Sequence, residues 1–320
     1  MSPAGSGSRS GPAGSVTRTV RTDRPISLRL TLGPLRRGGG DPTMRIGADG
    51  VWRATRTPVG TVTTHVTSDG RGGLTMLAWG DGSEWALDAF PDLVGATDAD
   101  DPLDAMSLHP LVAECRRRLP GLRIGRSQAV VEALVPTIIE QKVVGVDAKG
   151  SYAQLVRRLG EPAPGPAGAA GMRVPPAPAT WAATPSYVFH RCDVERKRAD
   201  TIRVACTYAA RLEETVGMAS ADASRRITAL PGIGPWSAAE VAMVALGDAD
   251  AVSVGDYHLP HLVAWALAGE PRADDARMLE LLEPYRGQRG RVIRLILAGS
   301  TAGTPPRRGP RMPLRSIASF

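Results

Sequence analysis

Cysteine, lysine and aromatic residues are all scarce in this chain of 320 residues, and each scarcity excludes a class of protein. The three cysteines, Cys115, Cys192 and Cys206, are too few and too scattered for a disulfide framework or a zinc site. No apolar run approaches the roughly 18 residues of a membrane helix, and the N-terminus lacks the apolar core of a secretion signal. We therefore expect a cytoplasmic protein with reduced thiols and no membrane partner.

Lysine occurs at three positions only, so arginine carries nearly all of the positive charge. The net charge is +7 and the pI is about 9.8. A basic protein suits a polyanionic partner such as nucleic acid, although charge alone identifies no partner.

The strongest local signals lie between Ser220 and Tyr257. Residues 221–229 predict a short helix that starts at a polar cap, and a second helix is predicted by apolar residues at i, i+3, i+4 and i+7 from Ala238. Between the helices runs Leu-Pro-Gly-Ile-Gly-Pro-Trp-Ser-Ala (230–238), in which Pro235 suits the first helical position. The pattern predicts a helical hairpin whose turn exposes backbone N–H groups at a helix N-terminus, which is a binding site for phosphate.

An apolar run, residues 251–254, follows the hairpin and ends in Gly255-Asp256-Tyr257, which places one carboxylate near the phosphate site. The hairpin followed by Gly-Asp-Tyr resembles the helix-hairpin-helix (HhH-GPD) DNA glycosylases, specifically the 3-methyladenine DNA glycosylase II type. The resemblance implies that the hairpin grips a DNA phosphate and that Asp256 is the catalytic residue. It also implies that no cofactor is required and, because no four-cysteine cluster follows the hairpin, that the iron–sulfur cluster of some relatives is absent.

Further site residues follow from the same resemblance. Backbone amides around Gly232, Gly234 and Ser237 are expected to hold DNA. Gln141 and Lys142, at the end of the apolar block 129–144, are expected beside the DNA, with Lys142 either wedged into the hole left by an extruded base or in contact with a phosphate. The carbonyls of Thr228, Leu230 and Ile233 are candidates to hold a Na⁺ or K⁺ ion at the hairpin.

The resemblance is weakest at the base pocket, which related alkylbase enzymes line with several aromatic side chains. This chain offers Trp236, Tyr257 and Tyr285. Glu240 and Arg294 stand where an aromatic side chain is expected, and the two would either make the pocket polar or pair at a surface.

One position separates the two reaction types of the family. Lyases of this family carry a lysine two residues after the second hairpin glycine, and its amine attacks C1′ to form a Schiff base. This chain has Trp236 there, which cannot form an imine, so we expect no lyase activity.

The expected fold class is α+β, with a small N-terminal antiparallel sheet followed by an all-α glycosylase core. Residues 1–24 are expected to be a disordered basic tail, 25–105 the sheet domain, 106–302 the helical domain and 303–320 a second basic disordered tail. Strands are expected over 26–32, 51–57, 61–67 and 74–79. The Pro/Ala/Gly-rich segment 161–180 is expected to be a flexible loop.

The sequence thus predicts a monofunctional DNA glycosylase of base excision repair that removes damaged, alkylated purines flipped out of double-stranded DNA. We expect it to act as a monomer in the cytoplasm, on the nucleoid if the source is bacterial. Two alternatives stay open: a glycosylase for deaminated or oxidised bases, and a non-catalytic helix-hairpin-helix DNA-binding protein.

Overall fold

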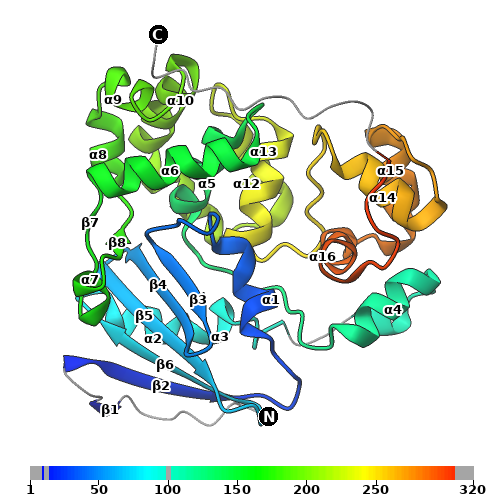
Figure 1. Cartoon of the computed structure of the whole chain (residues 1–320), viewed down its shortest axis with the longest axis horizontal. Helices are drawn as coiled ribbons and strands as arrows, with labels where there is room; N and C mark the ends of the chain where they lie inside the picture. Colours follow the sequence, from blue (N-terminus) through cyan, green and yellow to red (C-terminus); the bar gives the residue numbers. More distant parts are fainter. Residues whose placement is uncertain (1–8, 11–13, 99–101, 307–320) are drawn as a thin grey trace.

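The computed structural model describes residues 9–10, 14–98 and 102–306. An antiparallel sheet forms one side of the molecule and helices form the rest (Figure 1), so the expected α+β class is confirmed. The strands are β1 Arg9–Ser10, β2 Val16–Arg21, β3 Met44–Gly47, β4 Gly50–Thr57, β5 Gly60–Ser68, β6 Gly73–Trp79, β7 Glu161–Pro162 and β8 Arg173–Val174.

Helices account for most of the chain after residue 80. The α-helices are α1 Leu28–Leu32, α2 Ser83–Asp88, α3 Phe90–Leu93, α4 Pro110–Arg118, α5 Val130–Glu140, α6 Gly145–Leu159, α7 Pro166–Ala169, α8 Pro178–Ala183, α9 Ser186–His190, α10 Arg196–Thr207, α11 Ala209–Glu213, α12 Ser220–Thr228, α13 Pro235–Val241, α14 Leu259–Ala268, α15 Asp275–Leu282 and α16 Arg289–Gly299. Shorter segments are the 3₁₀ turns η2 Gly33–Leu35, η3 Pro102–Ala105, η4 Glu214–Gly217 and η6 Glu283–Tyr285, and the π-helical segment η5 Ala242–Leu246. None of the described helices is long and apolar enough to cross a membrane.

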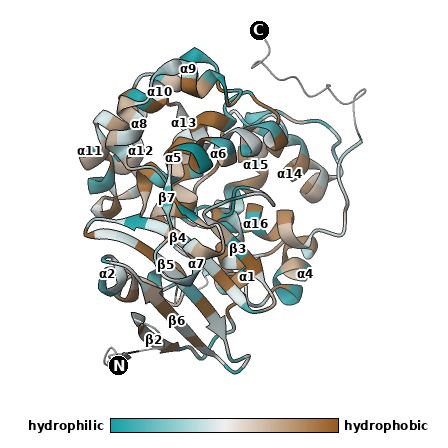
Figure 2. Cartoon of the chain, turned by 60° about the vertical axis from the view of Figure 1, so that its left-hand side comes forward, coloured by the Kyte–Doolittle hydropathy of each residue, from teal (hydrophilic) through white to brown (hydrophobic). Residues whose placement is uncertain are grey.

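The main sheet has the strand order β1-β2-β6-β5-β4-β3, with every pair antiparallel. Three of the predicted strands are confirmed as β4, β5 and β6. Apolar residues alternate with polar ones along these strands (Figure 2), so one face packs against α2 and α3 around the buried Phe90.

Two expectations for the N-terminal region are wrong. Residues 1–24 are not disordered throughout, because Val16–Arg21 forms β2 and pairs with β6 from Val16↔Ala78 to Arg21↔Gly73. Four of the six residues of this strand are Val or Thr, which favour strands, and the other two are Arg. The Gly- and Ser-rich residues before the strand concealed this signal. Residues 1–8 and 11–13 of the predicted tail lie outside the described residues.

The strand expected over residues 26–32 is instead the short helix α1. Ser27 caps it, since its hydroxyl accepts a hydrogen bond from Leu30 N at 3.4 Å. Leu32 packs into the core of the sheet with 2 % of its surface exposed. The alternation of residues predicted a strand, but the polar cap and this apolar contact favour a helical turn.

The segment 161–180 is also ordered rather than a flexible loop. β7 and β8 pair as a hairpin around α7, and Ala163, Met172 and Val174 bury their side chains against Ala54 of β4. The proline and glycine content predicted flexibility, but the few apolar residues among them have a surface of the sheet to cover.

Two apolar cores hold the helices together. α5 runs through the first, with Leu134 and Ile138 fully buried among α6, α8–α10 and α13. The second core joins α4, α14, α15 and α16 at the other end of the helical region (Figure 1). Residues 307–320 of the predicted C-terminal tail lie outside the described residues.

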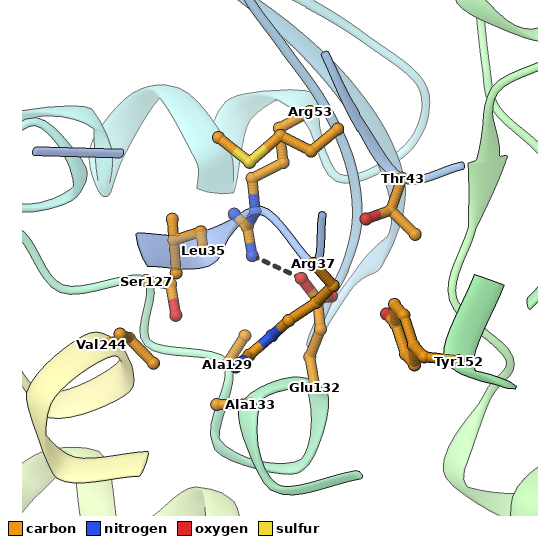
Figure 3. Close-up of a pocket in the computed structure, with 11 residues that line it drawn as sticks. Leu35, Arg37, Thr43, Arg53, Ser127, Ala129, Glu132, Ala133, Tyr152 and Val244 are labelled. Atoms are coloured by element: carbon orange, nitrogen blue, oxygen red, sulfur yellow. Dashed lines mark hydrogen bonds and ion pairs between the residues drawn. The ribbon is translucent and has the colours of Figure 1, made fainter. Parts of the chain in front are cut away.

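A polar joint fixes the sheet to α5. The Glu132 carboxylate of α5 accepts hydrogen bonds from Arg53 Nη2 at 2.7 Å and from Thr55 Oγ1 at 2.5 Å, both on β4. Figure 3 shows this pair beside a cavity of about 20 Å³ that Arg37 and Tyr152 also line, enough space for about one water molecule. These hydrogen bonds therefore fix α5 relative to β4 and the sheet.

The segment before α5 is tied to the π-helical segment η5. Ser127 N donates to Val244 O at 2.9 Å, and Gln128 N donates to Ala245 O at 3.0 Å. Gly247, at φ +71°, ends η5. The hairpin's second helix and the start of α5 are thus connected through the backbone.

Candidate active site

The predicted helical hairpin is present as α12, a tight turn and α13. Gly232 lies in the turn at φ +83°, and a Cβ there would come within 2.7 Å of the Thr201 hydroxyl. This position requires glycine for both its backbone conformation and the space.

Gly234 plays a different part in the turn. It is the N-cap of α13 with extended backbone, and no atom lies within 4 Å of the position of an added Cβ. Pro235 occupies the first turn of the helix, as predicted. The first N–H groups of a helix have no acceptor within the helix, and the open space around Gly234 lets an anion approach this helix start closely.

Gln141, at the end of α5, supports the turn through two hydrogen bonds. Its Nε2 donates to Gly232 O at 3.0 Å and to Ser237 Oγ at 2.9 Å. Ser237 is 1 % exposed, so its hydroxyl is an internal support of the turn. Of the predicted DNA contacts, the structure gives Gln141 a positioning role.

Lys142 follows directly and is exposed, at φ +55° between α5 and α6. Arg198 Nη1 donates to Gln141 O at 2.9 Å and thereby fixes the peptide that leads into this residue. Lys142 thus lies next to Gln141, the residue that contacts the hairpin turn. That place is compatible with either predicted contact, with a base gap or with a phosphate.

The Asp256 carboxylate is held by three donors. Its Oδ1 accepts from the backbone N–H groups of His258, at 2.7 Å, and Leu259, at 2.8 Å, at the start of α14. Its Oδ2 accepts from the indole Nε1–H of Trp236 at 3.0 Å. The loop is fixed from the other side, since Gly255 N donates to both carboxylate oxygens of Asp275 on α15.

This arrangement brings the carboxylate to the second helix of the hairpin, as the sequence predicts. Trp236 is partly buried and orients Asp256, a role that the sequence did not reveal. A carboxylate whose orientation is set by three donors is prepared to stabilise a positive charge, or to orient a water molecule, next to it.

Glu240 lies on α13 four residues after Trp236, so the two side chains share one face of the helix. Ser253 Oγ donates to Glu240 Oε1 at 2.5 Å. Burial raises the pKa of Glu240, and the neighbouring Glu140 and Asp256 raise it further, while the Ser253 hydroxyl and Arg37 lower it. The position is therefore a polar, partly buried site next to Asp256.

Two residues predicted for the base pocket, Tyr285 and Arg294, lie elsewhere. Tyr285 is 3 % exposed in the core of α14–α16, and its hydroxyl accepts from His109 N at 2.9 Å. Arg294 is 7 % exposed and donates to the carbonyls of Arg123 at 3.3 Å and Leu30 at 2.5 Å. Burial lowers the pKa of its guanidinium to about 10. Both predictions are wrong, because core packing and backbone acceptors occupy these side chains.

The expected pairing of Glu240 with Arg294 is also wrong. The partner of Glu240 is Ser253, and Arg294 belongs to the joint between α1, the segment before α5 and α16. Tyr257 points into solvent with 80 % of its surface exposed, edge-on to His258 and His261. Trp236, Glu240 and the exposed Tyr257 are thus the predicted base-pocket residues that adjoin Asp256.

Sequence reasoning missed two charged neighbours of this site. Arg37 comes from the loop after η2, and its Nη1 lies 3.6 Å from Glu140 Oε2, with 12 % and 17 % of these side chains exposed. Both act on the Glu240 carboxyl. The signal available in the sequence is Arg-Arg-Gly-Gly-Gly (36–40), an arginine pair ahead of a flexible turn, but its distance in the chain from the hairpin concealed its place.

No grouping of three or more His, Cys, Asp or Glu side chains suited to a metal ion occurs within the described part of the chain. The predicted cation ligands Thr228, Leu230 and Ile233 lie at the end of α12 and in the turn. Leu230 O also accepts from Ile233 N at 3.2 Å. The cation site stays a prediction.

Comparison with solved structures identifies the fold. A 3-methyladenine DNA glycosylase from Archaeoglobus fulgidus superposes with a TM-score of 0.71 at 18 % identity, over 88 % of this chain and 97 % of that one. An 8-oxoguanine glycosylase/lyase from Clostridium acetobutylicum gives 0.66 at 14 % identity, over 91 % and 97 %. That enzyme has also been solved with double-stranded DNA that contains cytosine opposite 8-oxoguanine.

Comparison with curated sequences finds relatives in two strains of Mycobacterium tuberculosis, each a probable bifunctional transcriptional activator/DNA repair enzyme AlkA. Identity is 30 % over 186 residues, which are 54 % of this chain and 37 % of the relative. The chain therefore matches little more than a third of the length of these relatives. No protein-family model matches the chain.

Proposed function

We propose, from the premise that this chain has the fold of the helix-hairpin-helix DNA glycosylases, that it is a DNA glycosylase of base excision repair. The resemblance stated from the hairpin sequence is confirmed by these structural neighbours and by the AlkA-type relatives. We infer a small sheet domain followed by a helix-hairpin-helix core, acting on alkylated purines in double-stranded DNA. The observation that carries the proposal is the Asp256 carboxylate, fixed by Trp236 beside the open turn of the hairpin.

The proposed reaction uses the groups already described. The first-turn amides of α13 hold a phosphate of the damaged strand and offset the cost of unstacking the base, a few kcal/mol. With the base turned out, C1′ lies next to Asp256. As the bond to the base breaks, positive charge develops on the sugar, and the carboxylate stabilises that charge and orients the attacking water. An alkylated purine that already carries positive charge leaves without a strong proton donor.

The same geometry supports hydrolysis without a lyase step, because Trp236 stands where a lyase would carry its amine. We also propose a monomeric enzyme, bound to DNA through phosphates. A Na⁺ or K⁺ ion on the carbonyls of Thr228, Leu230 and Ile233 would lie between the hairpin and the nearest phosphate.

Asp256→Asn tests the proposal. The asparagine carbonyl can still accept from His258 N and Leu259 N, so the turn is kept, whereas its NH₂ group faces the Trp236 N–H and the negative charge is lost. We expect single-turnover release of 7-methylguanine from a duplex to fall by at least 100-fold, about 2.7 kcal/mol of barrier, with affinity for the duplex unchanged.

Asp88→Asn is the matched control, since this aspartate is 89 % exposed on α2 and far from the hairpin in the sequence. It should release base at the wild-type rate. An Asp256→Asn variant that keeps more than about a tenth of the wild-type rate would remove Asp256 from catalysis. A wild-type protein that binds DNA and releases no base would support the non-catalytic alternative instead.

A further inference from the structure

Glu240 is an acidic neighbour of Asp256 to which the reaction above gives no task. It occupies the same face of α13 as Trp236, one helical turn later, a rise of about 6 Å that is comparable with the length of a purine. Trp236 reaches Asp256 and Glu240 reaches Ser253, three residues before Asp256. A base whose sugar lies at Asp256 therefore meets the next turn of this helix, where Glu240 is.

Burial is the largest cause that raises the pKa of Glu240, and the nearby carboxylates of Glu140 and Asp256 raise it further. The Ser253 hydroxyl and the Arg37 guanidinium lower it. Like charges close together and out of water disfavour one another, so this environment shifts Glu240 toward its protonated form.

The hydrogen bond to Ser253 fixes which oxygen can act. Ser253 is 2 % exposed and donates to Oε1, so Oε2 is the carboxyl oxygen left to carry a proton. Arg37 closes the other side from the N-terminal segment, where Figure 3 shows it reaching toward α5. Its charge keeps the pKa of Glu240 from rising further.

We propose that Glu240 is a second catalytic residue, the general acid that protonates the departing base. As the C1′–N bond breaks, its electron pair passes to the base, and the Oε2 proton moves to a ring nitrogen of that base. Water adds to C1′ and gives one proton to Asp256, so one proton leaves Glu240 and one is returned to the site. This inference rests on the proposed glycosylase function and extends it to neutral lesions.

A proton donor matters only for a base that leaves as an anion, which separates two substrate classes. A base with a fixed positive charge, such as 7-methylguanine, leaves as a neutral molecule and gains little from an acid. A neutral base, such as hypoxanthine, gains the 10²–10⁴-fold typical of general acid catalysis. If Glu240 were instead an ionised group that pairs with cationic bases, the order of dependence would be reversed.

Glu240→Gln distinguishes these roles in single-turnover assays on two duplexes, one with deoxyinosine and one with 7-methyldeoxyguanosine. Glutamine keeps an oxygen that can accept from Ser253 but has no proton to give. We expect hypoxanthine release to fall by about 100-fold or more and 7-methylguanine release by less than about 10-fold. Glu283→Gln, whose side chain is 53 % exposed at the end of α15, is the matched control and should match the wild type on both duplexes.

The pH profile is the second readout. The acid is active while protonated, so the rate on deoxyinosine should be high below the raised pKa of Glu240 and fall as pH rises through it. This alkaline limb should be missing in Glu240→Gln and on 7-methylguanine. Arg37→Gln removes the cation that lowers the pKa of Glu240, so it should move the limb to higher pH.

The outcomes separate this inference from the function on which it rests. Release of 7-methylguanine by the wild type without release of hypoxanthine would overturn the inference and leave the glycosylase function standing. Equal losses on both duplexes in Glu240→Gln, or an alkaline limb that Arg37→Gln does not move, would also overturn it. A wild type that releases neither base would contradict the glycosylase function itself.

Discussion

At the scale of single residues, the two hairpin glycines differ in what they allow. Gly232 has a left-handed backbone and packs against Thr201, so a side chain there strains the fold. Gly234 has an ordinary extended backbone with open space around it, so a side chain there leaves the fold intact and meets whatever binds from outside. The first glycine is required by the fold, whereas the fold does not require the second.

Gly234→Asp is therefore expected to fold with unchanged stability and to bind every DNA duplex more weakly, by about 10-fold or more, since it places a negative charge where the hairpin meets a phosphate. Fluorescence anisotropy on several unrelated duplexes measures the loss, and thermal denaturation checks the fold. Gly234→Ala supplies the matched control, because it adds the Cβ without the charge and should bind nearly as well as the wild type. If Gly234→Asp binds as tightly as the wild type, the hairpin is not the DNA anchor.

Residues whose positions depend on neighbours in the chain were placed correctly from the sequence. Gly232 lies in the turn, Pro235 starts α13 and Asp256 lies beside the hairpin, as the motif predicted. Tyr285 and Arg294 were misplaced, because packing in the core and the carbonyls of distant segments determine where these side chains go. A tyrosine or arginine carries no local signal that separates a pocket from a core.

At the scale of elements, three pieces of backbone meet at the site: the hairpin, the end of α5 and the loop before α14. Gln141 joins the first two and Trp236 joins the first and third. No strand or helix boundary predicts these joints, since each depends on one side chain of the right length. Trp236 also occupies the position next to Asp256, so no amine stands there.

We expect no β-lyase activity for that reason. Borohydride should trap no covalent adduct between the protein and a duplex with an abasic site, and the released product should keep an intact strand. Lys142 carries an exposed amine and directly follows Gln141, whose side chain contacts the hairpin turn. Lys142→Ala therefore belongs in the same experiment. An adduct that disappears in Lys142→Ala would assign lyase chemistry to that lysine, and one that persists would contradict the role given to Trp236.

At the scale of the whole molecule, the sheet and the helices are joined by the largely buried contact between Arg53 of β4 and Glu132 of α5. Arg53 is 8 % exposed and depends on Glu132 for its charge partner. The alternating residues of β4 predicted a strand, but nothing in them predicted that one polar face of it would be covered by α5. Such a contact between segments about 80 residues apart is determined by the tertiary fold alone.

Glu132→Ala should lower the free energy of unfolding by about 3–5 kcal/mol, because it leaves a buried guanidinium unpaired. Urea denaturation measures this change. Glu161→Ala is the control, since Glu161 pairs with Arg56 while 55 % of its side chain is exposed, and its loss should cost less than about 1 kcal/mol. Equal costs for the two variants would show that the joint does not hold the sheet to the helices.

The π-helical segment Ala242–Leu246 has a consequence for how many residues the chain can have at this point. A π turn holds one more residue than an α turn. Deleting one residue there would rotate the following backbone by about 100° and carry the carbonyls of Val244 and Ala245 away from Ser127 and Gln128. The start of α5 would then lose its register against the hairpin. The number of residues between Trp236 and Asp256 therefore cannot change even by one without loss of this register. Insertions or deletions there should be far less tolerated than substitutions.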